Sequence, residues 1–486
     1  MTWATPGISI NTSNGDILSN PSNNSKALKS GIWYTASNFL VRSIGFITTP
    51  IFTRLLTHAE FGLYNNYISW LAILTILVTL NLDSTLISAR YDFEDTLDEY
   101  ILSTLSLSTL STVIWLAAAN LFPAFFENYL GMDLVYVNTM LVYLLFLPAV
   151  HLFQARERYY FEYKMTVATS LFISVGTAAL SVLMVVSMED KLAGRIFGSA
   201  IPTIVLGAIL YLFFIKKGRK LTLGYWKYAL PICLPFIPHL LSLSALNSMD
   251  RIMITRWCGA EDNAIYSLAY TCGAIVTLLM TSMNSAFAPW LGEKLNYGKH
   301  EEIRSFSKIY VLGFSFLAVG IMALAPEVLA IMGPKSYSDG KYVITPIAMG
   351  CVCQFLYTLF VNVEQFKRKT VGMAFASVFA ALVNYVLNYV FIPKVGYLAA
   401  AYTTLAGYLC LLVIHMLLVY RLKLSDVYDY KMISITVVVM MGITVLISFM
   451  YSYNIVRYIF ILVYFIVFIM ILMRYKDKLL NLVKGR

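Results

Sequence analysis

The chain contains about fourteen apolar stretches, each close to 20 residues long, separated by short polar segments. A helix of that length crosses the hydrocarbon core of a bilayer and satisfies its own backbone hydrogen bonds there. Hydrophobic residues make up 59% of the 486 residues and charged residues only 13%, far from the balance of a soluble domain. We therefore predict an all-α integral membrane protein. The expected spans are residues 32–52, 63–83, 101–126, 133–154, 166–188, 196–215, 229–249, 264–286, 308–332, 342–363, 371–392, 396–420, 432–451 and 455–473.

An internal repeat shows how these spans are organised. The segment 53–79 recurs without a gap as the segment 255–281, with identical residues at eight of the 27 aligned positions. Identities at polar positions, such as Thr53 with Thr255, are harder to obtain by chance than matches between apolar residues. The repeat pairs span 2 with span 8, and an even offset keeps both halves in the same orientation. Internal repeats of this kind are typical of transporters whose substrate site lies between the halves.

Lys and Arg in the loops support the same count. With the N-terminus in the cytoplasm, about 26 of the 36 basic residues fall on the cytoplasmic side and about 9 on the other, as expected of short loops. We predict a polar cytoplasmic tail (1–30), a six-helix bundle (31–215), a basic linker (216–228), a second six-helix bundle (229–420), and two further helices with a basic cytoplasmic tail (421–486). The net charge of +10 thus reflects topology and indicates no nucleic-acid partner.

Several function classes find no support in the sequence. There is no GxxxxGK[ST] loop for ATP, and the loops are too short for the soluble catalytic domain usual in membrane glycosyltransferases and polymerases. The six cysteines lack metal-ligand spacing, so we expect no disulfide, no metal and no cofactor. Transport is therefore a better interpretation than catalysis.

Ionisable residues inside the bilayer are costly and mark candidate sites. Arg42 lies near the middle of span 1, where it either lines a central cavity or pairs with a buried partner. Span 7 contains three prolines, Pro231, Pro235 and Pro238, which remove backbone donors and predict a bend that can act as a hinge. His239 follows them directly, and cavity-facing and structural roles remain equally open for it, as they do for His151.

Charged residues at span ends are candidates for gates or for the interface between the halves. Asp250 and Arg251 end span 7, and Asp83 ends span 2 ahead of an acidic loop. Arg54 and Arg256 occupy equivalent positions of the repeat. Interfacial charge pairs or a solvated surface are the alternatives for these residues.

Three segments resemble bacterial polysaccharide and O-antigen repeat-unit flippases. The segment from Asn247, NSMDRIMITRWCGAEDNAIYSLAY, is similar to their DR-x-x-x motif followed by G-x-x-x-x-x-x-Y, and NYVLNYVFIPKVGYLAAAYTT, from Asn384, to N-x-x-L-N-x-x-x-I-P-x-x-G. TRLLTHAEFGLYNNY resembles the L-x-x-x-x-F-G-x-Y motif at the start of helix 2. Ala399 departs from the family, which often has Gly there. The resemblance is to the multidrug/oligosaccharidyl-lipid/polysaccharide (MOP) flippase superfamily, and it implies a V-shaped pair of six-helix bundles, as in MATE transporters, with helices 13 and 14 outside.

The resemblance further implies export of undecaprenyl-diphosphate-linked oligosaccharide units across the bacterial inner membrane by alternating access. Arg42 favours this branch, because a guanidinium pairs well with a diphosphate whereas an exporter of organic cations needs acids. A lipid II flippase and a cation-coupled multidrug exporter are the alternatives. The expected partners are the lipid-linked substrate, membrane lipids, and polysaccharide polymerase and chain-length proteins. We expect a monomer, with a proton or sodium ion as the possible coupling ion.

Overall fold

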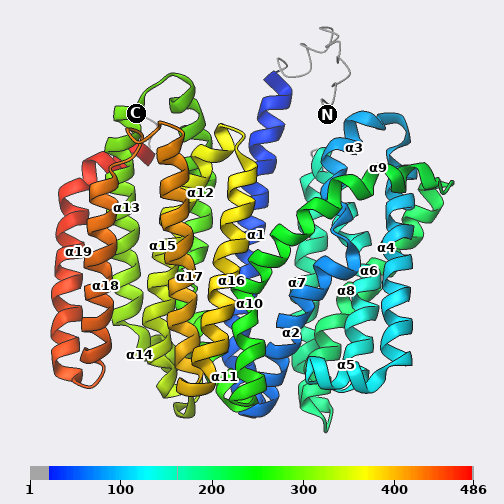
Figure 1. The fold of residues 1–486 in the computed structure, drawn as a ribbon, viewed down its shortest axis with the longest axis horizontal. Helices are drawn as coiled ribbons and strands as arrows, with labels where there is room; N and C mark the ends of the chain where they lie inside the picture. The colour runs from blue at the N-terminus through cyan, green and yellow to red at the C-terminus, as the bar shows by residue number, and fades with distance from the viewer. Residues whose placement is uncertain (1–20, 161, 484–486) are drawn as a thin grey trace.

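The computed structural model describes residues 21–160 and 162–483, and over these residues it contains helices and no strand (Figure 1). The N-terminal half consists of α1 (Pro21–Leu55), α2 (His58–Thr79), η2 (Leu82–Thr85), α3 (Leu86–Asp92), η3 (Glu94–Thr96), α4 (Leu97–Leu121), α5 (Pro123–Leu130), α6 (Leu134–Tyr159), α7 (Tyr163–Ser187) and α8 (Lys191–Gly218). The C-terminal half consists of α9 (Leu223–Cys233), η4 (Leu234–Phe236), α10 (Ile237–Trp257), α11 (Ala260–Gly273), α12 (Val276–Asn296), α13 (His300–Ala323), α14 (Ala325–Met332), η5 (Lys335–Gly340), α15 (Lys341–Phe366), α16 (Thr370–Val395), α17 (Tyr397–Arg421), α18 (Tyr430–Met450) and α19 (Asn454–Val483).

The all-α membrane fold is confirmed. Within the described residues, twelve helical segments are long and apolar enough to cross a bilayer. α1 and α19 are continuous helices of 35 and 30 residues but are not among the twelve, so the count of fourteen spans stays a prediction. Most of the predicted tail (1–30) lies outside the described residues, and α1 begins at Pro21, inside that tail.

Four of the expected spans are divided between two α-helices in the structure; the seventh, divided between α9 and α10, is described below. The third is divided between α4 and α5, and the ninth between α13 and α14; a proline lies at the start of α5 and of α14, where its missing N–H costs nothing. The eighth is divided into α11 and α12 by a short turn at Ala274 and Ile275.

The two halves are built in the same way. In the first half α7 packs on α8, α6 on α8 and α1 on α7; in the second α16 packs on α17, α15 on α17 and α10 on α16. The short helices α5 and α14 occupy equivalent places in the chain. α1 begins and α19 ends at the same end of the molecule, the upper end in Figure 1, which we call the terminal end. α5, α14 and the start of α11 lie at the opposite end (Figure 1).

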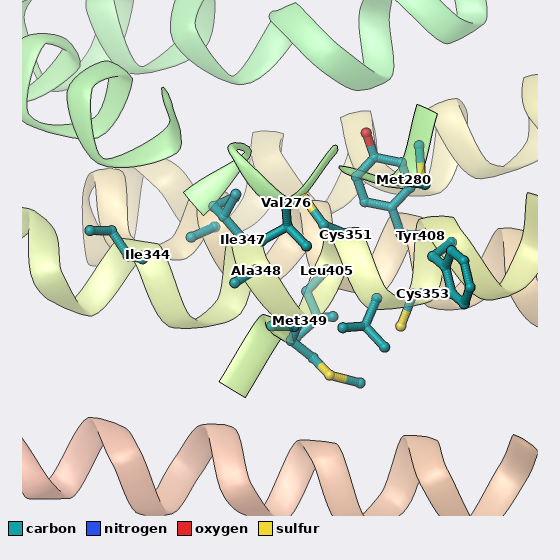
Figure 2. Close-up of a cluster of buried hydrophobic side chains, with 14 of the residues drawn as sticks. Val276, Met280, Ile344, Ile347, Ala348, Met349, Cys351, Cys353, Leu405 and Tyr408 are labelled. Atoms are coloured by element: carbon teal, nitrogen blue, oxygen red, sulfur yellow. The ribbon is translucent and has the colours of Figure 1, made fainter. Parts of the chain in front are cut away.

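α15 is the central helix of the second bundle, and it lies against α11, α12, α13, α17 and α18. Figure 2 shows Ile347, Ala348 and Cys351 of α15 packed between Val276 of α12 and Leu405 of α17, and all five side chains are buried. Such close packing gives this bundle a rigid core.

α18 and α19 are attached to the outside of the second bundle. The guanidinium of Arg457, which is 2% exposed, donates to both carboxylate oxygens of Glu327 on α14, at 2.5 and 2.6 Å. The same side chain donates to the backbone carbonyl of Ala323 at 3.1 Å. This fork fixes the start of α19 to the second bundle.

The link between the halves is a broken helix. α9 packs on the first bundle, where Trp226 Nε1 donates to the carbonyl of Ser103 at 2.7 Å and the Tyr228 hydroxyl to Asp92 at 2.5 Å. α10 packs mainly within the second bundle, against α16 and α11, and also contacts α2 of the first bundle. The turn η4 joins them, with Pro231 before it, Pro235 inside it and Pro238 directly after it in α10. The three prolines therefore lie where the chain passes from one bundle to the other.

Candidate functional site: a cavity in the first bundle

A cavity of ≈ 450 Å³ lies in the first bundle, lined by α1, α2, α6, α7 and α8, with Thr271 of α11 from the other half. Its face on α1 carries Val41, Ile44, Gly45, Thr48 and Phe52. These positions recur at helical spacing over eleven residues, so the cavity extends about 16 Å along α1. Hydroxyl and amide groups provide most of the remaining polar lining: Thr49, Asn65, Gln154, Ser170, Ser174 and Thr177. None of the described lining residues is acidic.

Arg195 is the one guanidinium among the described lining residues. Its Cζ lies 3.8 Å from the ring centroid of Phe52 and 4.1 Å from that of Tyr64. Nη1 donates to the Ser181 hydroxyl at 2.7 Å, whereas Nε is buried without a hydrogen-bond partner. No aspartate or glutamate in the described part of the chain forms an ion pair with it. The cavity therefore presents a positive charge that no carboxylate compensates.

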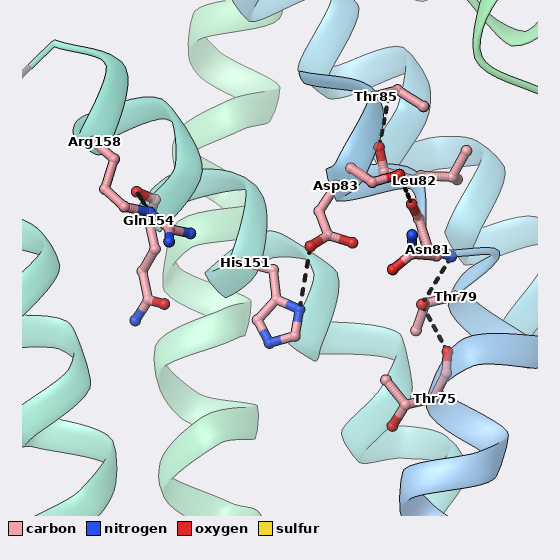
Figure 3. Close-up of polar contacts among 10 residues, drawn as sticks. Thr75, Thr79, Asn81, Leu82, Asp83, Thr85, His151, Gln154 and Arg158 are labelled. Carbon is pink, nitrogen blue, oxygen red and sulfur yellow. Dashed lines mark hydrogen bonds and ion pairs between the residues drawn. The ribbon is translucent and has the colours of Figure 1, made fainter. Parts of the chain in front are cut away.

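His151 and Asp83 lie close to each other on the side of the cavity nearer the terminal end (Figure 3). His151 lines the cavity, and its Nδ1 lies 3.9 Å from a carboxylate oxygen of Asp83 on η2. Both side chains are partly exposed, at 42% and 36%. Gln154, one turn further along α6, donates to the hydroxyls of Thr169 and Ser170 on α7 at 3.2 and 3.1 Å. This group belongs to the half of the cavity nearer the terminal end.

The two bundles are joined at the opposite end. The Thr53 hydroxyl donates to the carbonyl of Met332 at 2.7 Å, and the Asn263 amide donates to the carbonyl of Gly62 at 2.8 Å. His58 Nε2 lies 2.9 Å from the Ser336 hydroxyl. Within the described residues, every hydrogen bond between the segments 21–218 and 237–421 lies at this end. The two bundles therefore meet at the end of the molecule where Phe52 and Arg195 lie, which we call the closed end.

The second bundle has a buried polar core in place of a charged cavity. The Asp250 carboxylate, 1% exposed, accepts from the Tyr266 hydroxyl and from the Thr404 hydroxyl, the latter at 3.4 Å. Nearby, the buried amides of Asn384 and Asn388 are hydrogen-bonded to each other. Carboxylate, amide and hydroxyl oxygens are the ligands that hard cations prefer. No group of three or more His, Cys, Asp or Glu in the described residues could hold a metal ion.

The family model for polysaccharide biosynthesis proteins matches residues 27–295, more than half of the chain. The protein belongs to this family. A second family model, MatE, matches residues 235–390.

Among its relatives, an uncharacterised membrane protein of Haemophilus influenzae is 21% identical over 373 residues, which cover 73% of this chain and 88% of the relative. The fold is similar to that of the lipid II flippase MurJ in an inward closed conformation, with a TM-score of 0.66, 13% identity, and coverage of 92% of this chain and all of that one. It is also similar to an inward-facing multidrug resistance MATE family transporter of the MOP superfamily, with a TM-score of 0.59, 14% identity, and coverage of 80% and 95%. The resemblance to the MOP superfamily is thus confirmed, and the fold is the one found in MurJ and in MATE transporters.

The predicted cavity residues lie apart from one another. Arg42 is exposed and lies on α1 at the edge of the face that lines the cavity, about 100° around the helix from Val41 and about 20° from Thr49. It lies about 20 Å along α1 from Leu55, where the helix ends at the closed side. His239 lies near the start of α10, outside this cavity, with a buried Nδ1 that has no hydrogen-bond partner.

The predicted gate residues occupy three different places. Arg54 donates to the carbonyl of Ile331 at 3.1 Å and so lies in the contact between the bundles. Arg256, its equivalent in the repeat, is exposed at the end of α10. Arg251 lies over the ring of Tyr270 at 4.3 Å, and Asp250 beside it is buried in the second bundle.

Sequence reasoning missed Arg195, the most prominent charged group of the cavity. It lies just before the predicted span 196–215, whereas α8 begins four residues earlier at Lys191. One signal was present: Tyr64, which contacts Arg195, is a conserved position of the internal repeat with Tyr266.

Proposed function

We propose that this protein is a flippase for oligosaccharide repeat units linked to a polyprenyl diphosphate, such as undecaprenyl diphosphate, and that these units serve O-antigen, capsule or exopolysaccharide synthesis. The observation that carries the proposal is the cavity itself, which is closed at one end, lined by hydroxyl and amide groups, and charged by an unpaired guanidinium. Hydroxyl and amide groups bind sugar hydroxyls, while a cation attracts a molecule that carries negative charge.

We further propose that the terminal end faces the cytoplasm of a bacterial cell and that the membrane is the inner membrane. In this orientation the structure is closed to the outside. The lipid-linked substrate enters from the inner leaflet, with its polyprenyl tail in the bilayer and its diphosphate near Arg42 on the flank of the cavity. Opening the contacts of Thr53, Gly62 and His58, while the bundles close at the terminal end, then exposes the glycan to the outside.

The broken helix α9–η4–α10 is suited to this motion. α9 is hydrogen-bonded to the first bundle and α10 packs in the second, so the bend at η4 changes when the bundles rock against each other. Prolines deprive the turn of backbone hydrogen bonds and lower the cost of bending it. We assign the hinge role to Pro231, Pro235 and Pro238.

Two related functions are less well supported. An exporter of organic cations needs carboxylates in its cavity, and the described lining here has none. A lipid II flippase handles the same diphosphate and differs in its glycan, so only a substrate comparison separates the two. We take the protein to act as a monomer beside a polysaccharide polymerase and chain-length proteins, driven by a proton or sodium gradient.

Reconstitution tests the proposal. The purified protein is placed in liposomes with a polyprenyl-diphosphate disaccharide whose sugar carries the fluorophore NBD, and external dithionite reports the exposed fraction. We expect faster loss of the protected fluorescence than in liposomes without protein, and a marked slowing by Arg42→Ala. Faster movement of NBD-labelled lipid II than of the disaccharide would support the lipid II alternative. Export of ethidium in the absence of lipid movement would overturn the proposal.

A further inference from the structure

The two arginines near the cavity lie at different depths. Arg195 is four residues from the start of α8 at the closed end, or about 6 Å along the helix, whereas Arg42 is about 20 Å from that end on α1. The difference of about 14 Å is roughly half the thickness of the hydrocarbon core, which is ≈ 30 Å. The two arginines therefore lie at separate levels along the cavity.

A lipid-linked substrate fixes which of its groups reaches which arginine. When the substrate enters the state described here, its polyprenyl tail lies in the bilayer core and its diphosphate is near the interface of the leaflet from which it enters, because a charged group in hydrocarbon is costly. Only the glycan can extend into the cavity towards its closed end. The group that meets Arg195 is then part of the glycan and not the diphosphate.

The surroundings of Arg195 indicate what kind of group it binds. Phe52 and Tyr64 contact the guanidinium through their rings and bring no negative charge. Ser181 satisfies one nitrogen, and Nε remains buried without a partner. A largely enclosed cation without a counter-ion is costly, and an anionic ligand removes that cost. A neutral sugar hydroxyl can accept one hydrogen bond from Arg195 but leaves its charge uncompensated.

From this geometry we infer that Arg195 selects repeat units whose glycan carries an acidic substituent, a carboxylate as in a uronic acid or a phosphate ester. Either group accepts hydrogen bonds from the guanidinium edge through two oxygens. The inference rests on the proposed function and specifies its substrate class. Arg195 is the specificity-determining residue, and the diphosphate binds in the half of the cavity nearer the terminal end.

Three fluorescent probes test the inference in binding measurements with the full-length protein in lipid nanodiscs. They are a polyprenyl-diphosphate disaccharide ending in glucuronate, the same molecule with the carboxylate as its methyl ester, and the polyprenyl diphosphate without sugar. We expect wild-type protein to bind the glucuronate about tenfold or more tightly than the ester, as a charge-assisted hydrogen bond implies. Equal binding of glucuronate and ester by the wild type overturns the inference, and this comparison needs no variant.

Matched variants assign the preference to a residue. Arg195→Gln is expected to bind glucuronate and ester equally and to leave the sugar-free diphosphate unaffected, and Arg195→Lys to restore part of the preference. Arg42→Gln is expected to weaken all three probes by a similar factor. If Arg195→Gln weakens all three probes alike, Arg195 binds the diphosphate and the inference is wrong, although the proposed function stands. If the wild type binds none of the three, the proposed function itself fails.

Discussion

A methyl group added to Gly62 would place its carbon 1.7 Å from the carbonyl oxygen of Ala260. Gly62 belongs to α2 of the first bundle and Ala260 to the start of α11 in the second, so the two backbones touch at the closed end. Any side chain at position 62 therefore forces the bundles apart. The closeness of this contact makes it a sensitive point for controlling which end of the protein is open.

Gly62→Ala is expected to favour the state that is open to the outside. Overpacking costs about 1–3 kcal/mol in the closed state, which corresponds to roughly 5- to 150-fold in population. Asn65 lines the cavity, and the substitution Asn65→Cys places a thiol there. The measurement is the rate at which an external, membrane-impermeant maleimide labels this cysteine. Gly313→Ala is the control, because a Cβ there meets no atom within 4 Å. Unchanged labelling in Gly62→Ala would show that the contact does not limit opening.

Removing the prolines at the bend is expected to slow export. The double variant Pro235→Ala, Pro238→Ala restores two backbone donors and favours a continuous helix, which stiffens the link between the bundles. We expect a lower flipping rate in liposomes and no loss of thermal stability. Pro123→Ala, at the start of α5 and away from the bend, serves as the control. A wild-type rate in the double variant would contradict the hinge assignment.

Asp250→Asn is expected to uncouple export from an ion gradient. The amide keeps a hydrogen-bond acceptor for Tyr266 and Thr404, so the bundle should fold, but the charge needed to bind a proton or sodium ion is lost. The test compares flipping rates with and without an imposed pH or sodium gradient. Asp95→Asn is the control, because Asp95 is exposed and the substitution removes a negative charge from the surface only. Full gradient dependence in Asp250→Asn would exclude Asp250 from coupling.

Breaking the ion pair between Arg457 and Glu327 is expected to loosen α19. Arg457→Met leaves the partly exposed Glu327 without its partner, at a cost of about 1–3 kcal/mol. The observable is a lower Tm of the detergent-solubilised protein. The double variant with Glu327→Gln should be destabilised by less than the sum of the single variants. Strict additivity would mean that the pair contributes nothing.

Acid pH is expected to release the loop between α17 and α18. The hydrogen bond from His300, at 2.6 Å, holds the pKa of the Asp426 carboxyl below its usual range. A lowered pKa in the folded state means that this contact stabilises the loop above the pKa of the unfolded chain, about 4, and is lost as pH falls through the folded value. Hydrogen exchange of residues 422–430 should accelerate as the pH falls through the pKa of Asp426 in the folded protein. In Asp426→Asn the exchange should already be fast at neutral pH and show no further acid transition.

Much of this fold can be predicted from the sequence because the bilayer imposes its own length on each helix. Apolar stretches near 20 residues place most of the long helices within a few residues, and the repeat predicts the matching arrangement of the two halves. The breaks are less predictable. Pro123 and Pro326 sit inside apolar stretches, and only packing at the closed end determines that the chain turns there and forms the separate helices α5 and α14.

The cavity could be predicted only in part. Arg42 is visible as a charge in an apolar stretch, but its direction depends on how α1 rotates against α7, which hydropathy does not encode. Arg195 follows a polar segment, a pattern that predicts a loop residue. Its place in the cavity results from Phe52 and Tyr64, which belong to other helices and are brought to it by tertiary packing.

Tyr64 and Tyr266 occupy equivalent positions of the internal repeat, yet the first touches a guanidinium and the second a carboxylate. A symmetric pair of halves would have offered the same charge twice. The two halves instead hold opposite charges at equivalent positions, a guanidinium beside Tyr64 and a carboxylate beside Tyr266. Exchanging the partners of the two tyrosines, Arg195 and Asp250, would therefore reverse the sign of the charge that each half presents.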